Sequence, residues 1–333
     1  MSKTNDLGRD PIGKLVLKLA IPSMLAQFVN VFYGIVDRMY IGHIPHVGDL
    51  ALAGVGVCGP IVTLISSFAF LVGLGGAPLM AIRLGEKNKE GAQKILANAF
   101  LMLCVLALLL TGGALLLKKP MLMAFGASGA TYGYANEYMT IYVLGTLFAI
   151  LSVGLNQYII CQGYSTMGML SVAIGALANL LLDPLFIFAF GLGVCGAAIA
   201  TVISQTLSAA FVLYFLTRRS ELQVRLLKKE EFSVSLGYAK NIVSLGTAGF
   251  IMQLTNSLVT ICCNHVLSMT GGDIYISVMT IVSSVRQLVE TPIYAMNEGG
   301  SPILSYNYGA RRPARVRKAM VVMSAMILCY TAV

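Results

Sequence analysis

Two polar residues, Asn179 and Asp183, lie inside the otherwise apolar run SVAIGALANLLLDPLFIFAF at 171–190. Because they are four residues apart, a helix would place both side chains on one face. A carboxylate in the hydrocarbon of a membrane costs about 2.5–3.5 kcal/mol on insertion scales, so such a residue is first of all a candidate for binding an ion, a proton or a substrate. The alternative is a helix-end carboxylate before Pro184 that caps the helix or contacts lipid headgroups.

The composition is that of a membrane protein. Of the 333 residues, 57% are hydrophobic and 11% are charged, and the mean hydropathy is +0.80, whereas a soluble domain carries about 25% charged residues. The net charge of +9 would suggest nucleic acid in a soluble chain. Here the basic residues fall in loops on one side of the membrane, so we expect the lipid bilayer and no nucleic acid as a partner. The seven cysteines lack metal-ligand spacing and indicate neither a metal site nor disulfides.

A helix needs about 20 apolar residues to cross a ~30 Å hydrocarbon core. Runs of this length predict helices near 14–37, 50–82, 92–117, 132–161, 165–190, 192–216, 238–268 and 274–305, and a ninth from 314 to 333. Of the 23 Lys and Arg residues, 19 lie at the N-terminus or in the loops after the second, sixth and eighth helices. The positive-inside rule therefore predicts a multi-pass protein of the cell (inner or plasma) membrane with a cytoplasmic N-terminus.

An internal repeat indicates two related halves. GGAPLMAIRLGEKNKEGAQK at 75–94 aligns with GGSPILSYNYGARRPARVRK at 299–318 at an offset of 224. AQFVN at 26–30 aligns with MQLTN at 252–256 at an offset of 226, and it pairs Gln27 with Gln253 and Asn30 with Asn256. Both copies of the longer motif lead into a basic loop, so the halves have the same orientation and are related by an axis along the membrane normal.

We therefore predict an all-α integral membrane protein, a polytopic bundle of two pseudo-symmetric six-helix halves. Residues 1–216 form the N-terminal six-helix bundle, 217–237 a basic cytoplasmic linker, and 238–333 a partial C-terminal bundle of two helices and most of a third. By this symmetry three more helices should follow residue 333. The sequence is expected to be a C-terminally truncated part of a longer protein, or else a protein that departs from its own symmetry.

Three motifs carry a resemblance to a known family. They are IPSMLAQFVNVFYGIVD at 21–37, ANLLLDPLFIF at 178–188 and PILSYNYGARR at 302–312. Together they resemble the multidrug and toxic compound extrusion (MATE) family of antiporters, and look closest to its bacterial multidrug branch. The resemblance implies two six-helix bundles around a central cavity, which alternate between inward-open and outward-open forms. It also implies export of organic cations and amphipathic drugs in exchange for H⁺ or Na⁺, with no other cofactor and no enzymatic activity. A monomer is expected.

The resemblance also implies a polar network in the first bundle. Its members map onto Tyr33, Asp37, Tyr138, Asn156, Asn179, Asp183 and Thr201. At about 1.5 Å per residue along each predicted helix, all but Asn156 fall in the outer half of the membrane. Asn156 falls near the cytoplasmic side.

The coupling chemistry requires a carboxylate that changes state. Burial and a second nearby carboxylate both favour the neutral form of a carboxyl group, so Asp37 and Asp183 could exchange a proton, or could bind Na⁺ together with Asn179. Our hypothesis is that this event rearranges the helix at 14–37, hinged weakly at Pro22, and releases the substrate. An alternative for Pro22 is a tolerated kink without a mechanical role.

Secondary candidates for the polar interior are Gln27, Asn30, Gln253, Asn256, Arg286 and Glu290. Arg286 and Glu290 are four residues apart, so the spacing favours a pair that neutralises itself. Glu298, next to Gly299 and Gly300, is a candidate for the cytoplasmic mouth of the cavity. Asp37 has Cys263 as its mate at the offset of 226, so the carboxylate is not duplicated.

Three other functions are alternatives to an antiporter. A lipid or polysaccharide flippase of the same superfamily would line its cavity with basic residues, and here only Arg286 and Arg38 are available. A membrane enzyme would need a motif such as HExxH, GxSxG or a phosphate-binding loop, and the sequence has none of these. A channel or scaffold has no feature in its favour, and the repeat and the intramembrane carboxylates speak against it.

Overall fold

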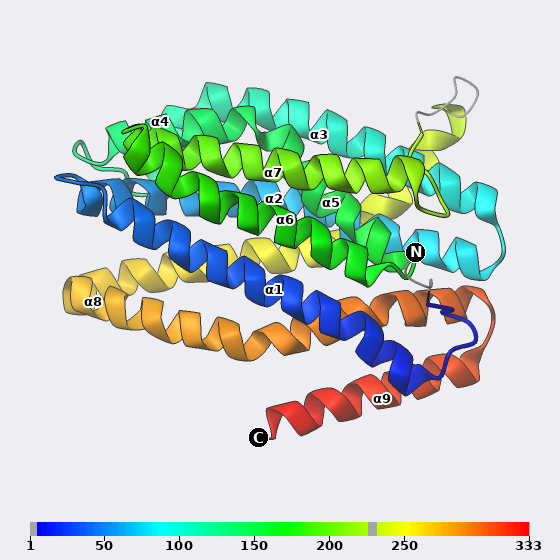
Figure 1. Ribbon diagram of the computed structural model, residues 1–333. Helices are drawn as coiled ribbons and strands as arrows, with labels where there is room; N and C mark the ends of the chain where they lie inside the picture. Colours follow the sequence, from blue (N-terminus) through cyan, green and yellow to red (C-terminus); the bar gives the residue numbers. More distant parts are fainter. Residues whose placement is uncertain (1–4, 226–231, 333) are drawn as a thin grey trace.

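The computed structural model describes residues 5–225 and 232–332, and this part of the chain is helical throughout apart from short connections (Figure 1). The elements, in chain order, are α1 (Ile12–Gly42), α2 (Gly48–Gly85), α3 (Lys89–Ala124), α4 (Tyr132–Leu144), α5 (Thr146–Cys161), α6 (Ser165–Pro184), the π-helical turn η1 (Leu185–Ala189), α7 (Gly193–Arg218), α8 (Phe232–Gly309) and α9 (Pro313–Thr331). The predicted all-α class is confirmed. The division at 216 and 238 stays a prediction, and residues 226–231 of the expected linker lie outside the described residues.

Six helices of the described chain are long and apolar enough to cross a membrane, and the number rises to seven if the bent pair α4 and α5 is one span. Large apolar side chains point outward from these helices, among them Leu108, Leu116 and Leu181. In water such a surface would be costly, whereas in a bilayer it matches the lipid tails. The expected membrane location follows from these features.

The predicted helix at 132–161 is wrong as a single element. It is divided into α4 and α5, which meet at Gly145 with a bend of 58°. A Cβ on Gly145 would lie 2.5 Å from the side chain of Val202 in α7, so the absence of a side chain lets the bend pack against α7. Hydropathy did not reveal this break because the apolar residues continue across it.

The predicted helix at 165–190 also changes character near its end. The α-helical part, α6, ends at Pro184, directly after Asp183, and the π-helical turn η1 follows. Proline has no N–H and so cannot continue the regular pattern of backbone hydrogen bonds. Short π-helical turns of this kind often occur at functional sites.

The two predicted helices at 238–268 and 274–305 form one helical element of 78 residues, α8. Figure 1 shows that α8 runs along the bundle in one direction (yellow) and returns in the other (orange). The predicted break at 269–273 is helical in the described backbone. The two passes still correspond to the two predicted membrane crossings, and helices α1 and α2 pack against α8.

The repeat seen in the sequence reappears as a reciprocal contact between α2 and α8. A Cβ on Gly85 would lie 2.8 Å from the amide nitrogen of Ala310 and would overlap the carbonyl oxygen of Tyr306. A Cβ on Gly309 would overlap the carbonyl oxygen of Ile82. Gly85 and Gly309 are repeat mates at the offset of 224, and so are Ile82 and Tyr306. The two halves therefore meet here through equivalent backbone positions, at a distance that only glycine allows.

A second pair of contacts obeys the same symmetry. Gly75 of α2 packs against the backbone at Gly246 in the first pass of α8, and its mate Gly299 packs against the backbone at Ala20 of α1. Gly246 and Ala20 are mates at the offset of 226. The offsets of both sequence motifs are thus repeated in the packing of the helices.

The loops after α2 and α8 and the N-terminal segment meet at one end of the bundle, which we call the basic end (Figure 1). There the N-terminal segment is held by the second half of the chain. Asn307 donates a hydrogen bond to the carbonyl of Leu7 (2.9 Å), Arg312 to that of Gly8 (2.7 Å) and Arg315 to that of Asp10 (2.8 Å). These contacts and the glycine contact at 85 and 309 close the basic end.

Candidate functional site

Asn179 and Asp183 of α6 are in direct contact, as their spacing predicted. The side-chain amide of Asn179 donates a hydrogen bond to Oδ1 of Asp183 at 3.1 Å. Both side chains are buried, with exposed fractions of 2% and 0%. A carboxylate touching lipid headgroups at a helix end would be exposed, so the burial of Asp183 argues against a headgroup contact.

Asp37 of α1 completes a pair of carboxyl groups. Its side chain lies within hydrogen-bonding reach of the side chain of Asp183. Packing between α1 and α6 positions the two residues, which are separated by 146 positions in the sequence. Two carboxylates in contact repel one another unless a proton or a cation lies between them.

Three oxygen atoms of this group lack a hydrogen-bond donor. They are Oδ1 of Asp37, Oδ2 of Asp183 and Oδ1 of Asn179, all buried within the described structure. A buried acceptor without a donor is costly, so such atoms indicate a missing partner. A proton shared by the two carboxyl groups would serve two of these oxygens, and a hard cation would use oxygen ligands of the same kind.

Tyrosines and a threonine surround the two carboxyl groups. Tyr33 lies one turn before Asp37 on α1 and close to both Asp37 and Asp183. Tyr138 of α4 is near Asp37 and makes a side-chain hydrogen bond with Thr201 of α7. Thr201 also donates a hydrogen bond to the carbonyl of Ala197 at 2.9 Å. The structure therefore brings together six of the seven residues implied by the resemblance.

Asn156 lies elsewhere. It belongs to α5, and its Oδ1 accepts a hydrogen bond from Ser171 at 3.3 Å. Ser171 is twelve residues before Asp183 in α6, which corresponds to about 18 Å along a helix. This placement agrees with the depth expected for Asn156 from the sequence.

Two residues of the site were missed by the sequence analysis. Tyr142 stacks on Tyr138 with ring centroids 6.1 Å apart, and its hydroxyl makes a side-chain hydrogen bond with Gln205. Tyr142 is four residues after Tyr138, and Gln205 is four residues after Thr201. The spacing that identified Asn179 and Asp183 would have found both.

The secondary candidates divide into separate groups. Arg286 and Glu290 form the predicted pair, with Nε and Oε1 3.8 Å apart. Gln27 contacts Glu298 rather than the Asp37 group. The remaining three are placed as follows: Asn30 is exposed on α1, Gln253 is half-buried on α8, and Asn256 is exposed on α8.

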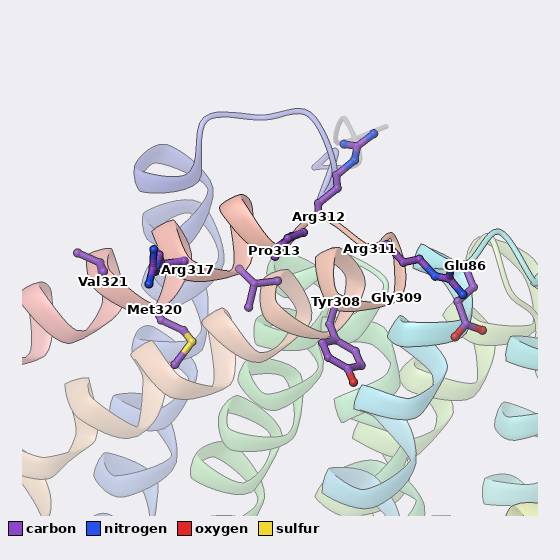
Figure 2. Close-up of a pocket in the computed structure, with 10 residues that line it drawn as sticks. Glu86, Tyr308, Gly309, Arg311, Arg312, Pro313, Arg317, Met320 and Val321 are labelled. Carbon is purple, nitrogen blue, oxygen red and sulfur yellow. The ribbon is translucent and has the colours of Figure 1, made fainter.

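A large pocket of about 900 Å³ lies at the basic end and is distinct from the Asp37 group. Figure 2 shows Arg311, Arg312 and Arg317 from the α8–α9 region on it, with Glu86, directly after α2, next to Arg311 and across from Arg317. Met320 and Val321 add an apolar wall. The pocket marks where the two halves meet at the surface, next to the glycine contact.

Comparisons with known proteins agree on one family. The MatE family model matches residues 22–185 and 249–333. The multidrug export protein MepA of Staphylococcus haemolyticus is 26% identical over 334 residues, which cover 97% of this chain and 71% of that protein. An outward-facing structure of a multidrug resistance MATE transporter has a TM-score of 0.90 and 25% identity, with coverage of 99% and 72%. A MATE structure in a bent conformation has a TM-score of 0.88 and 26% identity, with coverage of 98% and 73%.

Proposed function

The chain belongs to the MATE family of membrane transporters, and we propose that it is a secondary active antiporter that exports organic cations and amphipathic drugs in exchange for H⁺ or Na⁺. It acts in the cell membrane, with its N-terminus and basic end in the cytoplasm, in keeping with the distribution of Lys and Arg. The name of the related MepA proteins, multidrug export protein, supports this class of substrate. We propose small molecules and lipid as its only partners, and a monomer as its functional unit.

The observation that carries the proposal is the group of unpartnered oxygens at Asp37, Asn179 and Asp183. Two carboxyl groups in contact inside a membrane need a positive charge, and the amide of Asn179 supplies only a neutral donor to Asp183. A proton or Na⁺ fits the atoms that are present. Entry of this charge from outside and its release to the cytoplasm would supply the driving force for export.

The proposed cycle links this site to the opposite end of α1. In the form described here, backbone contacts at Gly85 and Gly309 close the basic end. Uptake of the coupling ion at Asp37 and Asp183 neutralises their repulsion and draws α1 and α6 together. Because Pro22 interrupts the hydrogen bonding of α1 between the two ends, the movement of α1 about Pro22 would open the site toward the cytoplasm.

The test is ethidium export from cells that make the protein at its natural full length with Asp183→Asn. Asparagine keeps the size of the side chain but removes the charge, so we expect export to fall to the background of cells without the protein. The matched control is Asp49→Asn, which makes the same change at an exposed carboxylate in the first turn of α2. Unchanged export by Asp183→Asn at normal protein level would refute the proposal.

The coupling ion is identified in membrane vesicles. An imposed pH gradient and an imposed Na⁺ gradient are applied separately, and ethidium movement is followed by fluorescence. We expect one of the two gradients to drive transport by the unsubstituted protein and neither to drive transport by Asp183→Asn. A flippase would respond to neither gradient, and the pairing of Arg286 with Glu290 leaves that arginine less suited to bind a phosphate.

A further inference from the structure

Another carboxylate, that of the half-buried Glu298, joins the two halves of the chain far from Asp37. It lies in the returning pass of α8, and its Oε1 accepts a hydrogen bond from the side-chain amide of Gln157 in α5 at 2.7 Å. The amide of Gln27 in α1 lies 3.5 Å from Oε2. Within the described residues no Lys or Arg nitrogen comes within 4.0 Å of this carboxylate. The protein groups that hydrogen-bond to it in the described structure are therefore neutral amides, with no cationic side chain among them.

The position of Glu298 separates it from the coupling site. Gly309 marks the end of α8 at the basic end, and Glu298 lies eleven residues before it, which corresponds to about 16 Å along the helix. Its partner Gln27 lies ten residues before Asp37 in α1, or about 15 Å. Glu298 is thus on the side of the molecule that opens to the basic end, and the Asp37 group is on the other.

Close packing holds this contact shut. Gly299, the next residue, approaches α1 so closely that a Cβ there would lie 2.6 Å from the amide nitrogen of Ala20. The hydroxyl of Tyr158, next to Gln157, donates a hydrogen bond to the carbonyl of Val72 at 2.9 Å and occupies the space beside Gly76. Opening of the basic end has to separate α8 from α1 and α5 here, and so has to remove both amides from the carboxylate.

An anion that loses its donors in the interior of a membrane protein needs a replacement. A cation that enters from the basic end is the natural one, because the carboxylate has no other positive charge beside it. When this end closes again, the amides of Gln157 and Gln27 return and compete with the bound cation for the same oxygens. The carboxylate of Glu298 would then attract a cation in the open form, and the two amides would displace the cation on closing.

We propose that Glu298 is the residue that binds organic cations when the transporter opens at its basic end, and that Gln157 and Gln27 displace the cation when this end closes. The inference rests on the proposed export of cations and adds a specific residue for their recognition. The proposal makes a different prediction from the alternative that Gln157, Glu298 and Gln27 only hold the helices together. If the amides compete with the ligand, their removal has to strengthen cation binding, whereas removal of the carboxylate charge has to weaken it.

The experiment is equilibrium binding of radiolabelled tetraphenylphosphonium to the purified protein at its natural full length. Glu298→Gln keeps the shape and removes the charge, and we expect Kd to rise at least 10-fold. Gln157→Leu removes the closer competitor, and we expect Kd to fall at least 3-fold. Gln27→Leu removes the more distant one and should lower Kd less. Glu221→Gln, at an exposed glutamate that pairs with Lys89 on the surface, is the matched control and should leave Kd unchanged.

The outcomes separate the hypotheses. A change of Kd in the same direction for Glu298→Gln and Gln157→Leu would overturn the competition and leave a structural bridge. Equal Kd for Glu298→Gln and the unsubstituted protein would overturn the role of the charge. An unsubstituted protein that binds no tetraphenylphosphonium would overturn the proposal as a whole. If Gln157→Leu does not fold, Gln27→Leu still has to lower Kd. The export assay with Asp183→Asn is independent, so binding at Glu298 can hold even where coupled export fails.

Discussion

The contact between Gly85 and Gly309 can be tested by adding one methyl group on each side. In Gly85→Ala the new Cβ overlaps the carbonyl oxygen of Tyr306, and in Gly309→Ala it overlaps that of Ile82. Ordinary contact begins at 3.4 Å, so α2 and α8 have to move apart at the basic end. Overpacking of this kind costs about 1–3 kcal/mol, which corresponds to an increase of about 5- to 150-fold in the ratio of open to closed forms.

The two substitutions should not add. Both methyl groups push the same two helices apart, so the movement that accommodates the first also makes room for the second. Substitutions in direct contact commonly deviate from additivity by about 0.5–3 kcal/mol. We therefore expect the double variant to open the basic end little more than either single variant does.

Opening can be measured with two spin labels placed across the pocket of Figure 2. Glu86, directly after α2, and Arg317 on α9 are both exposed there, so each is replaced by Cys after the seven native cysteines have been removed. Double electron–electron resonance then gives the population of the longer distance. Gly112→Ala is the control, because a Cβ on Gly112 in α3 meets nothing within 4 Å. An unchanged distance distribution in Gly85→Ala, or a double variant whose effect equals the sum of the two, would refute the reasoning.

Two more outcomes follow from single contacts. Asn179→Leu removes the donor to the fully buried Asp183 and should slow ethidium export about 10-fold, since a buried hydrogen bond lost on one side costs about 1–3 kcal/mol; export at the normal rate would contradict this role of Asn179. Arg315→Lys keeps the charge but loses the planar group that binds both Asn307 and the carbonyl of Asp10, so thermal unfolding should occur several degrees lower, whereas an unchanged unfolding temperature would show that charge alone suffices.

The sequence was sufficient for contacts made within one helix. The hydrogen bond between Asn179 and Asp183 and the ion pair between Arg286 and Glu290 both follow from a spacing of four residues. The apolar helices followed from hydropathy for a similar reason, because a membrane-spanning helix satisfies its own backbone hydrogen bonds. Local spacing and composition determine these features, so no knowledge of the rest of the fold is needed.

Contacts between distant segments required the structure. Gln157 and Glu298 are 141 residues apart, and Gln27 and Glu298 are 271 apart. The bend at Gly145 was missed for a related reason, because it depends on the side chain of Val202 in another helix. Glycine in an apolar helix is common, and only its neighbour in space shows which one is essential.

The repeat also distinguishes the polar sites at Asp37 and Glu298 from the glycine contacts between the helices, because only the glycine contacts are duplicated. The glycine contacts between α2, α8 and α1 occur as mates in the two halves, as in Gly85 with Gly309. Asp37 and Glu298 have no carboxylate as a mate, because Asp37 corresponds to Cys263 at the offset of 226 and Glu298 to Leu74 at the offset of 224. The packing at these glycines is therefore duplicated, whereas the carboxylates at Asp37 and Glu298 each occur in one half only.

Helix α1 is the element common to both polar sites, since it carries Asp37 at one and Gln27 at the other. An ion at the Asp37 group can influence a cation at Glu298 only through a structural element whose position affects both. Helix α1 meets this condition, and Pro22 lies between its glycine contact at Ala20 and the contact at Gln27. A movement of α1 at Pro22 would thus change both the packing of Ala20 against Gly299 and the contact of Gln27 with Glu298. This arrangement lets one helix transmit the state of the coupling site to the site where the cation binds.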